Sequence, residues 1–154
     1  MQINIDNLTK ITMEGEIWKQ IENYPYLISN MGRVYGIERN RIERGEWTYN
    51  GYHRVVLSRS GETKKFRVSH LVAAAFCKGY AEGKHIHHIN RRRGDDRAVN
   101  LIPCTEAEHR LIHNLYDALG GNIELLMELL TPIIEPIRMT INLLYSDSEG
   151  GDVA

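Results

Sequence analysis

Histidines gather in one stretch of this 154-residue chain. Five of the seven lie between His85 and His113. His109 and His113 are four positions apart in a segment expected to be helical, so both imidazoles would lie on one face, about one turn apart. That spacing suits a divalent cation held by two nitrogens, although surface histidine pairs without a ligand are at least as common. The pair alone leaves both interpretations open.

A second pair, His87 and His88, adds a different capability. Adjacent residues on a strand point to opposite sides, so one imidazole could bind a metal while its neighbour works as a base. Hydrolysis of a phosphodiester needs both functions, because a water must be activated and negative charge on the phosphorane and the departing 3′ oxygen must be neutralised. Two histidines satisfied by local hydrogen bonds are the alternative, which leaves the spacing of the whole group unexplained.

Positive charge is concentrated in the middle of the chain. Residues 33–97 hold 15 Lys/Arg against 7 Asp/Glu, whereas residues 104–154 hold 2 against 9, and the net charge is -1. Coulomb attraction and counterion release would draw a polyanion such as DNA to the basic middle. Clustered basic residues also commonly form a solvated face, so this pattern by itself does not decide the function.

Several classes of protein are disfavoured by composition. Cys77 and Cys104 lie 27 positions apart without a CxxC spacing, and the N-terminus lacks a secretory signal, which favours a reducing, cytoplasmic setting. No stretch approaches the roughly 20 apolar residues needed to cross a bilayer. We therefore expect no membrane role.

The elements that must position the histidines follow from local patterns. Residues 1–14 show no clear period and are expected to form an N-terminal arm. Short β-prone runs then alternate with turn signals such as Asn50-Gly51 and Ser60-Gly61, which predicts a small antiparallel sheet. Ser69 is a plausible N-cap for a helix over Leu71 to Cys77.

The histidine region itself predicts strand, loop, strand and helix. Strands are expected at residues 85–89 and 101–103, and Thr105 with Glu108 forms a capping box for a helix from about Glu106 to Leu119 that Gly120-Gly121 would end. Apolar helical pieces are expected at 123–130 and 137–144, followed by a disordered polar tail from residue 146.

These motifs resemble a known family. The HNH endonucleases, which have a ββα-metal fold, share the pattern of Val68 to Phe76, Ile86 to Asn90, Asn100-Leu101, Glu108-His109 and His113. The runs Glu16 to Lys19 and Tyr24 to Tyr35 resemble the NUMOD4 module that precedes HNH domains in phage and intron-encoded homing endonucleases. Together the two resemblances cover about residues 14–115.

The resemblance implies roles for individual residues. His88 matches the general base, and Asn100 matches the residue that orients it. His87, His109 and His113 match metal ligands, the last of which occurs only in some subfamilies. Many homing relatives have Asp at the position of His87 and Asn at that of His109. The cofactor is therefore one divalent ion, either Mg or Mn, or Zn or Ni because three imidazoles form a softer site.

The resemblance also implies a DNA-binding surface. Four arginines, Arg91, Arg92, Arg93 and Arg97, lie in the loop between the two expected strands and could clamp phosphates, with a solvated loop as the alternative. Basic residues of the preceding sheet would position the duplex, among them Arg54, Lys64, Lys65 and Arg67. The Leu/Ile-rich C-terminal segment could pack on the body or form a homodimer.

The sequence thus predicts an α+β protein in three parts. A small antiparallel sheet in a NUMOD4-like module (1–67) leads into an HNH ββα-metal core (68–119) and a helical C-terminal segment with a disordered tail (120–154). The expected function is metal-dependent hydrolysis of DNA phosphodiester bonds, by nicking or double-strand cutting, in a phage or mobile-element protein. The alternatives are a non-catalytic DNA-binding module with a structural zinc, and an RNA-directed or structure-selective nuclease.

Overall fold

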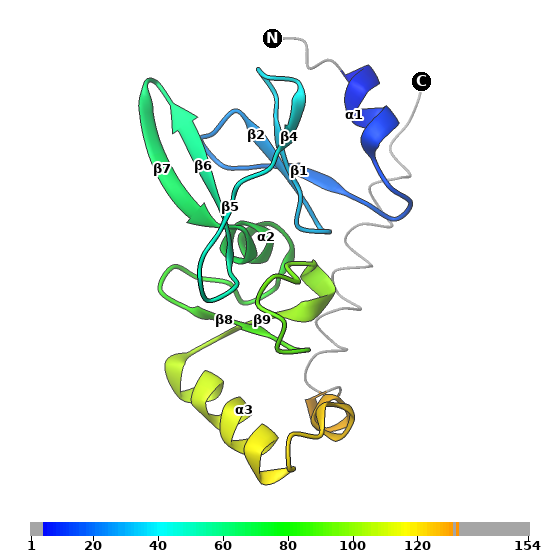
Figure 1. Cartoon of the computed structure of the whole chain (residues 1–154), viewed down its shortest axis with the longest axis vertical. Coiled ribbons are helices and arrows are strands. Elements are labelled where there is room, and N and C mark those ends of the chain that lie inside the picture. The colour runs from blue at the N-terminus through cyan, green and yellow to red at the C-terminus, as the bar shows by residue number, and fades with distance from the viewer. Residues whose placement is uncertain (1–4, 131, 133–154) are drawn as a thin grey trace.

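The computed structural model describes residues 5–130 and 132 and has the expected α+β architecture (Figure 1). Its elements in chain order are α1 (Ile5–Ile11), β1 (Trp18–Gln20), β2 (Tyr26–Ser29), β3 (Val34–Gly36), β4 (Arg41–Glu43), β5 (Glu46–Trp47), β6 (His53–Arg59), β7 (Glu62–Arg67), α2 (Val68–Phe76), β8 (His85–His88), the 3₁₀ turn η1 (Ala98–Asn100), β9 (Leu101–Cys104) and α3 (Glu106–Ala118). Residues 123–130 are also helical.

The N-terminal half forms two antiparallel sheets instead of the single sheet expected. Strands β1 to β4 pair in sequence order, and β5 to β7 form a separate sheet in sequence order. The break falls at Gly45, which has φ +64 and lies so close to β6 that an added Cβ would clash with the Arg54 carbonyl oxygen. Only glycine fits this close, left-handed turn, through which the chain passes from the first sheet to the second.

The expected N-terminal arm contains a short helix, α1. Its seven residues are too few to show a helical period, but Asp6 and Lys10 suit the charges of its two ends. The helix and the residues after it are tied to the first sheet by hydrogen bonds. Asn7 donates to the carbonyl of Asn40 at 2.9 Å, and the Trp18 indole donates to Thr12 at 2.9 Å. Tertiary contacts therefore stabilise a helix that local pattern did not predict.

Helix α2 begins earlier than expected. It starts at Val68, its N-cap is Arg67 without a side-chain cap, and Ser69 lies buried in the first turn. The prediction that Ser69 caps the helix is wrong, because Val68 and Val72 are both fully buried and their packing fixes the start of the helix directly after β7. Fully burying each valine contributes about 1.5–3 kcal/mol, which exceeds the typical 1 kcal/mol of a cap.

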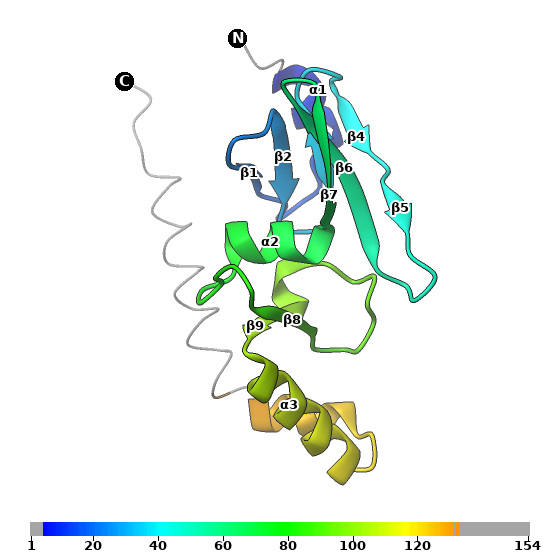
Figure 2. The same ribbon diagram turned by 90° about the vertical axis from the view of Figure 1, so that its left-hand side faces the viewer.

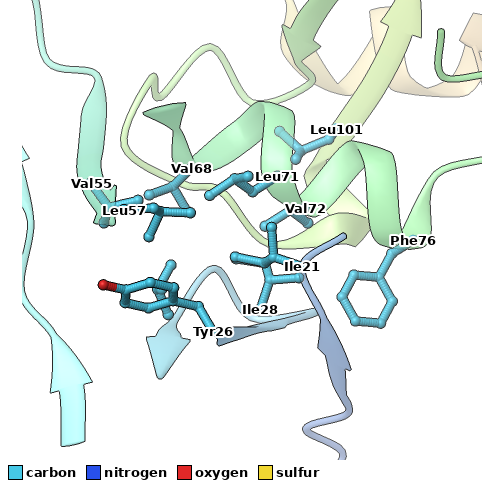
Figure 3. Packing of buried hydrophobic residues seen from close by; sticks show 11 residues of the cluster. Ile21, Tyr26, Ile28, Val55, Leu57, Val68, Leu71, Val72, Phe76 and Leu101 are labelled. Carbon is cyan, nitrogen blue, oxygen red and sulfur yellow. The ribbon is translucent and has the colours of Figure 1, made fainter. Parts of the chain in front are cut away.

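The main hydrophobic core joins the N-terminal sheets to the histidine region. Figure 3 shows side chains of β2, including Tyr26 and Ile28, meeting Val68, Leu71 and other residues of α2, with Leu101 of β9 above them. Both views of the ribbon place α2 between the sheets and the β8–β9 hairpin (Figures 1 and 2). The residues before and after the expected boundary at 67/68 therefore share one hydrophobic core.

Strands β8 and β9 and helix α3 form the expected ββα unit. In the hairpin His87 pairs with Ile102, and His88 with Leu101. The predicted capping box is confirmed, because Thr105 accepts from the Glu108 amide at 3.2 Å and Glu108 accepts from the Thr105 amide at 2.8 Å. The cap fixes where α3 begins, and so determines the position of His109 and His113 along the helix.

Part of the chain that follows α3 packs into a second hydrophobic cluster. Gly120 and Gly121 both have positive φ and end α3 as expected. In the helical residues 123–130, Leu126 and Leu130 are buried in a second cluster with Ile89 and Ile112. The helix expected at 137–144 and the tail from 146 lie outside the described residues. No helix within the described part of the chain is long and apolar enough to span a membrane.

Candidate metal centre

Three histidines meet between β8 and α3. His87 comes from the hairpin, and His109 and His113 come from α3, one turn apart. One nitrogen from each ring lies within 4.8 Å of the other two. The Nε2 atoms of His109 and His113 are 3.3 Å apart, and the His87 ring centroid is 5.4 Å from each of theirs. The fold thus brings together all three residues that the resemblance implied as ligands.

The environment of these imidazoles keeps them neutral. His87 is 2% exposed, and burial followed by the neighbouring histidines and Arg91 lowers its pKa to about 3. Burial also lowers the pKa of His109 and of His113, with further contributions from nearby basic groups. Neutral imidazole is the form that binds a metal.

Two observations indicate that the cluster fits a cation. Nε2 of His87 is buried and has no hydrogen-bond partner among the described residues, which is costly unless another species pairs with it. The 3.3 Å between the other two Nε2 atoms matches the roughly 3.4 Å that separates two ligands of one tetrahedral ion with bonds of about 2.0–2.1 Å. A ligand role for Nε2 of His113 would place the ring proton on Nδ1, which currently lies 3.0 Å from the Arg91 guanidinium. Arg91 would then have to release this contact.

His88 faces a different partner. Its Nε2 lies 2.9 Å from Oδ1 of Asp96, and both side chains are about 95% buried. A carboxylate on one ring nitrogen fixes the tautomer and leaves the lone pair on the other nitrogen. Asp96 was not among the predicted site residues. The available signal was an acidic pair, Asp95-Asp96, within a loop of four arginines.

Asn100 does not make the contact expected of it. The resemblance implied that it orients His88, but its side-chain amide donates to Asn90 Oδ1 at 3.0 Å and to the carbonyl of Asp95 at 2.8 Å, and its oxygen accepts from the Asn90 amide at 3.0 Å. The reason is geometric: Asn100 lies in η1, and its side chain forms its hydrogen bonds with Asn90 and Asp95, at the start and end of the 90–95 loop. The hydrogen bonds of Asn100 hold the two ends of this loop together, and Asp96 is the residue that pairs with the His88 ring.

One pocket contains the histidines and part of the predicted basic set. It is lined by Tyr52, Ile86, His87, His88, Arg91, Arg93, His109 and His113. The guanidinium carbons of Arg93 and Arg67 lie 5.2 and 4.0 Å from the ring centroid of Tyr52. The sequence did not single out Tyr52 as a site residue, because its neighbours in the chain are turn and strand residues.

The other predicted basic residues lie away from this pocket. Arg92 and Arg97 line a separate, open hollow beside Trp47, and Arg97 is held by two 2.7 Å hydrogen bonds to Asp95. Arg54 and Lys65 both pair with Glu46 at 3.0 Å. Lys64 lies over the Phe66 ring at 5.2 Å. The eight residues therefore form at least three groups: Arg91 and Arg93 line the histidine pocket, and Arg67 contacts Tyr52, which lines it too.

The fold and the histidine arrangement define a class. A ββα unit that carries a cluster of three imidazoles and follows this N-terminal module resembles the organisation of HNH endonucleases with a NUMOD4 module. A family model described as the NUMOD4 motif matches residues 16–58. This chain is an HNH-type protein with an N-terminal NUMOD4 module, as its sequence motifs predicted.

Individual relatives agree with this class. The DNA endonuclease I-HmuI of Bacillus phage SP01 is 37% identical over 91 residues, covering 58% of this chain and 52% of the relative. An uncharacterized HNH endonuclease, L247 of Acanthamoeba polyphaga mimivirus, is 31% identical over 121 residues, covering 70% and 29%. A solved structure of I-HmuI, an HNH homing endonuclease that binds and cleaves DNA, superposes with a TM-score of 0.61 at 30% identity, covering 75% of this chain and 66% of that one. The chain thus spans about half or less of the curated relatives it matches.

Proposed function

We propose that this protein is a metal-dependent endonuclease that hydrolyses phosphodiester bonds of DNA, by nicking or by cutting both strands. The observation that carries the proposal is the pocket in which His88 lies beside the cluster of His87, His109 and His113. The similarity to phage and viral HNH endonucleases supports the same chemistry.

His88 is the proposed general base. His88 is among the residues that line the pocket, and its Nε2 lies 2.9 Å from Asp96. A neutral imidazole with a free lone pair can take the proton of a water that attacks phosphorus, and a positioned base of this kind typically contributes 10² to 10⁴ in rate. The water's oxygen then forms the new bond to phosphorus as the bond to the 3′ oxygen breaks.

His87, His109 and His113 are the proposed metal ligands. A divalent ion bound there would supply positive charge to the phosphorane and the departing oxygen. Three imidazoles favour Zn, Ni or Mn over Mg, whose preferred ligands are oxygens. The described residues offer three ligands, which is the number typical of catalytic zinc sites, whereas structural zinc sites are closed by four.

Arg67, Arg91 and Arg93 are the proposed phosphate contacts nearest the reacting bond. Arg91 and Arg93 line the pocket, and Arg67 lies 4.0 Å from the ring centroid of Tyr52, which lines it too. The remaining predicted residues, Arg54, Lys64, Lys65, Arg92 and Arg97, would contact the duplex further away. Such contacts position the backbone and carry no base sequence information.

Plasmid cleavage tests the proposal. Supercoiled plasmid is incubated with the wild-type protein and each of Mg, Mn, Zn and Ni, and nicked and linear products are counted. We expect cleavage with at least one softer ion, and a loss of at least about 100-fold in His88→Ala with DNA and metal binding retained. His53→Ala is the matched control, because His53 lies in β6 outside the pocket.

The outcomes separate the competing functions. Intact plasmid under every ion, together with tight zinc binding and DNA binding, would identify a non-catalytic binding module. Cleavage of RNA in place of DNA would show that the substrate is RNA, and the proposed roles of the site residues would be unchanged.

Assembly and setting are further parts of the proposal. We infer a homodimer formed through the apolar C-terminal segment, supported by the exposed Leu125 and Leu129 in residues 123–130. Light scattering on the intact protein tests this, with Leu129→Glu expected to yield monomers. The phage relative supports a role in the cytoplasm of a bacterial host.

A further inference from the structure

We propose that Asp96 is a positioning residue for His88, and that the β2–β3 turn of the NUMOD4 module, residues 29–33, holds Asp96 in place. The module would then be part of the catalytic framework as well as a DNA-positioning unit. The inference rests on the proposed function, because it concerns how the base is aligned.

Asp96 and His88 form a buried pair that sets the ring. Oδ1 of Asp96 is 2.9 Å from Nε2 of His88, and each side chain is about 95% buried. When Nε2–H donates to the carboxylate, the lone pair needed for proton abstraction lies on Nδ1. Asn100 does not substitute for this contact, because its amide is used by the 90–95 loop.

The turn of the N-terminal module approaches Asp96 closely at Gly32. Gly32 has φ +81, and a Cβ added there would lie 3.1 Å from Cβ of Asp96 and 3.2 Å from its carbonyl carbon and oxygen. Next to this contact, the backbone amide of Ala98, two residues after Asp96, donates to the carbonyl of Asn30, two residues before Gly32, at 2.8 Å. The segment 96–98 is therefore seated on the turn by backbone contacts.

The turn is rigid enough to serve as this seat. Oγ of Ser29, a fully buried residue, accepts from the amides of Met31 and Arg33 at 3.2 and 3.1 Å. The Asn30 side chain accepts from the Ile17 amide at 2.8 Å and donates to the Gly15 carbonyl at 3.1 Å. A side chain held from several directions keeps one geometry, as a positioning function requires.

A glycine pair tests the seat. Gly32 and Gly61 have the same φ of +81, but nothing lies within 4 Å of a Cβ added at Gly61, in the β6–β7 turn. Gly32→Ala and Gly61→Ala should therefore suffer similar backbone strain, and Gly32→Ala should lose more Tm because its methyl group also crowds Asp96. Only Gly32→Ala should lower kcat, by at least about 10-fold, because small misplacements of reacting groups are costly. DNA Kd and metal affinity should stay unchanged in both. Equal kcat in the two variants would overturn the proposal.

A double-mutant comparison tests Asp96 itself. Asp96→Asn can donate to Nε2 of His88 and so select the wrong tautomer, with an expected kcat loss of about 100-fold or more at unchanged DNA Kd. If Asp96 acts through His88, the double variant Asp96→Asn/His88→Ala should be no slower than His88→Ala. A further loss in the double variant would show a separate structural role and contradict the proposal.

A spectroscopic readout keeps this inference distinct from the proposed function. The ¹⁵N NMR signals of His88 report which ring nitrogen carries the proton, without metal, DNA or turnover. We expect the Nε2–H form in the wild type and in Gly61→Ala, and a change to Nδ1–H in Asp96→Asn. An unchanged tautomer in Asp96→Asn would refute the positioning role, whereas failure of the wild type to cleave any plasmid would refute the proposed function alone.

Discussion

Acidification should destabilise the metal-free protein through His87. Its pKa is about 3 in the folded protein, because the ring is buried beside two other histidines, against an ordinary value of 6.5 for the unfolded chain. Between these two values the unfolded chain binds one more proton than the folded chain. Stability is therefore fully present above pH 6.5 and is lost as the pH falls toward 3.

The size of the effect depends little on the folded-state value. At pH 5 the solution is 1.5 pH units below the unfolded pKa, and each unit corresponds to about 1.36 kcal/mol, so His87 alone should lower the free energy of unfolding by about 2 kcal/mol. The lowered pKa values of His109 and His113 act in the same direction.

Urea denaturation measures this loss. The free energy of unfolding is determined at pH 7.5 and pH 5 in the presence of a chelator, for the wild type and for His87→Leu, with His53→Leu as the control. The wild type and the control should lose about 2 kcal/mol more than His87→Leu over this interval. The same loss in all three proteins would refute the reasoning that a buried, neutral His87 opposes protonation.

Three further predictions concern the frame and the DNA contacts. Thr105→Ala removes the capping box of α3 and should cost about 1 kcal/mol in urea denaturation, whereas Thr105→Ser should restore most of it. Asn100→Ala leaves the Asn90 amide and the Asp95 carbonyl without this partner and should cost about 1–3 kcal/mol, a loss that a residue serving only to orient His88 would not show. Arg93→Ala should reduce the slope of log Kd for DNA against log salt by about one, and an unchanged slope would rule out a phosphate contact.

Much of the site follows from local spacing along the chain. The i, i+4 interval of His109 and His113 fixes their common face once Thr105 and Glu108 define where the helix begins. The alternation of a strand predicts that His87 and His88 have different partners, and in the structure His87 meets the two histidines of α3 while His88 meets Asp96. These are short-range rules of helix and strand geometry, and the structure has the predicted capping box and places the three histidines together.

The tertiary structure alone decided the partners of these groups. Asp96 reaches His88 because the loop between β8 and β9 is seated on Gly32, a residue of another module far away in the sequence. The early start of α2 at Val68 likewise depends on side chains of β2 and β6 that pack against it. No local period encodes such contacts, because they arise only when distant segments exclude water together. The sequence by itself therefore determined the chemical groups and their spacing, while the folded core determined which carboxylate pairs with His88.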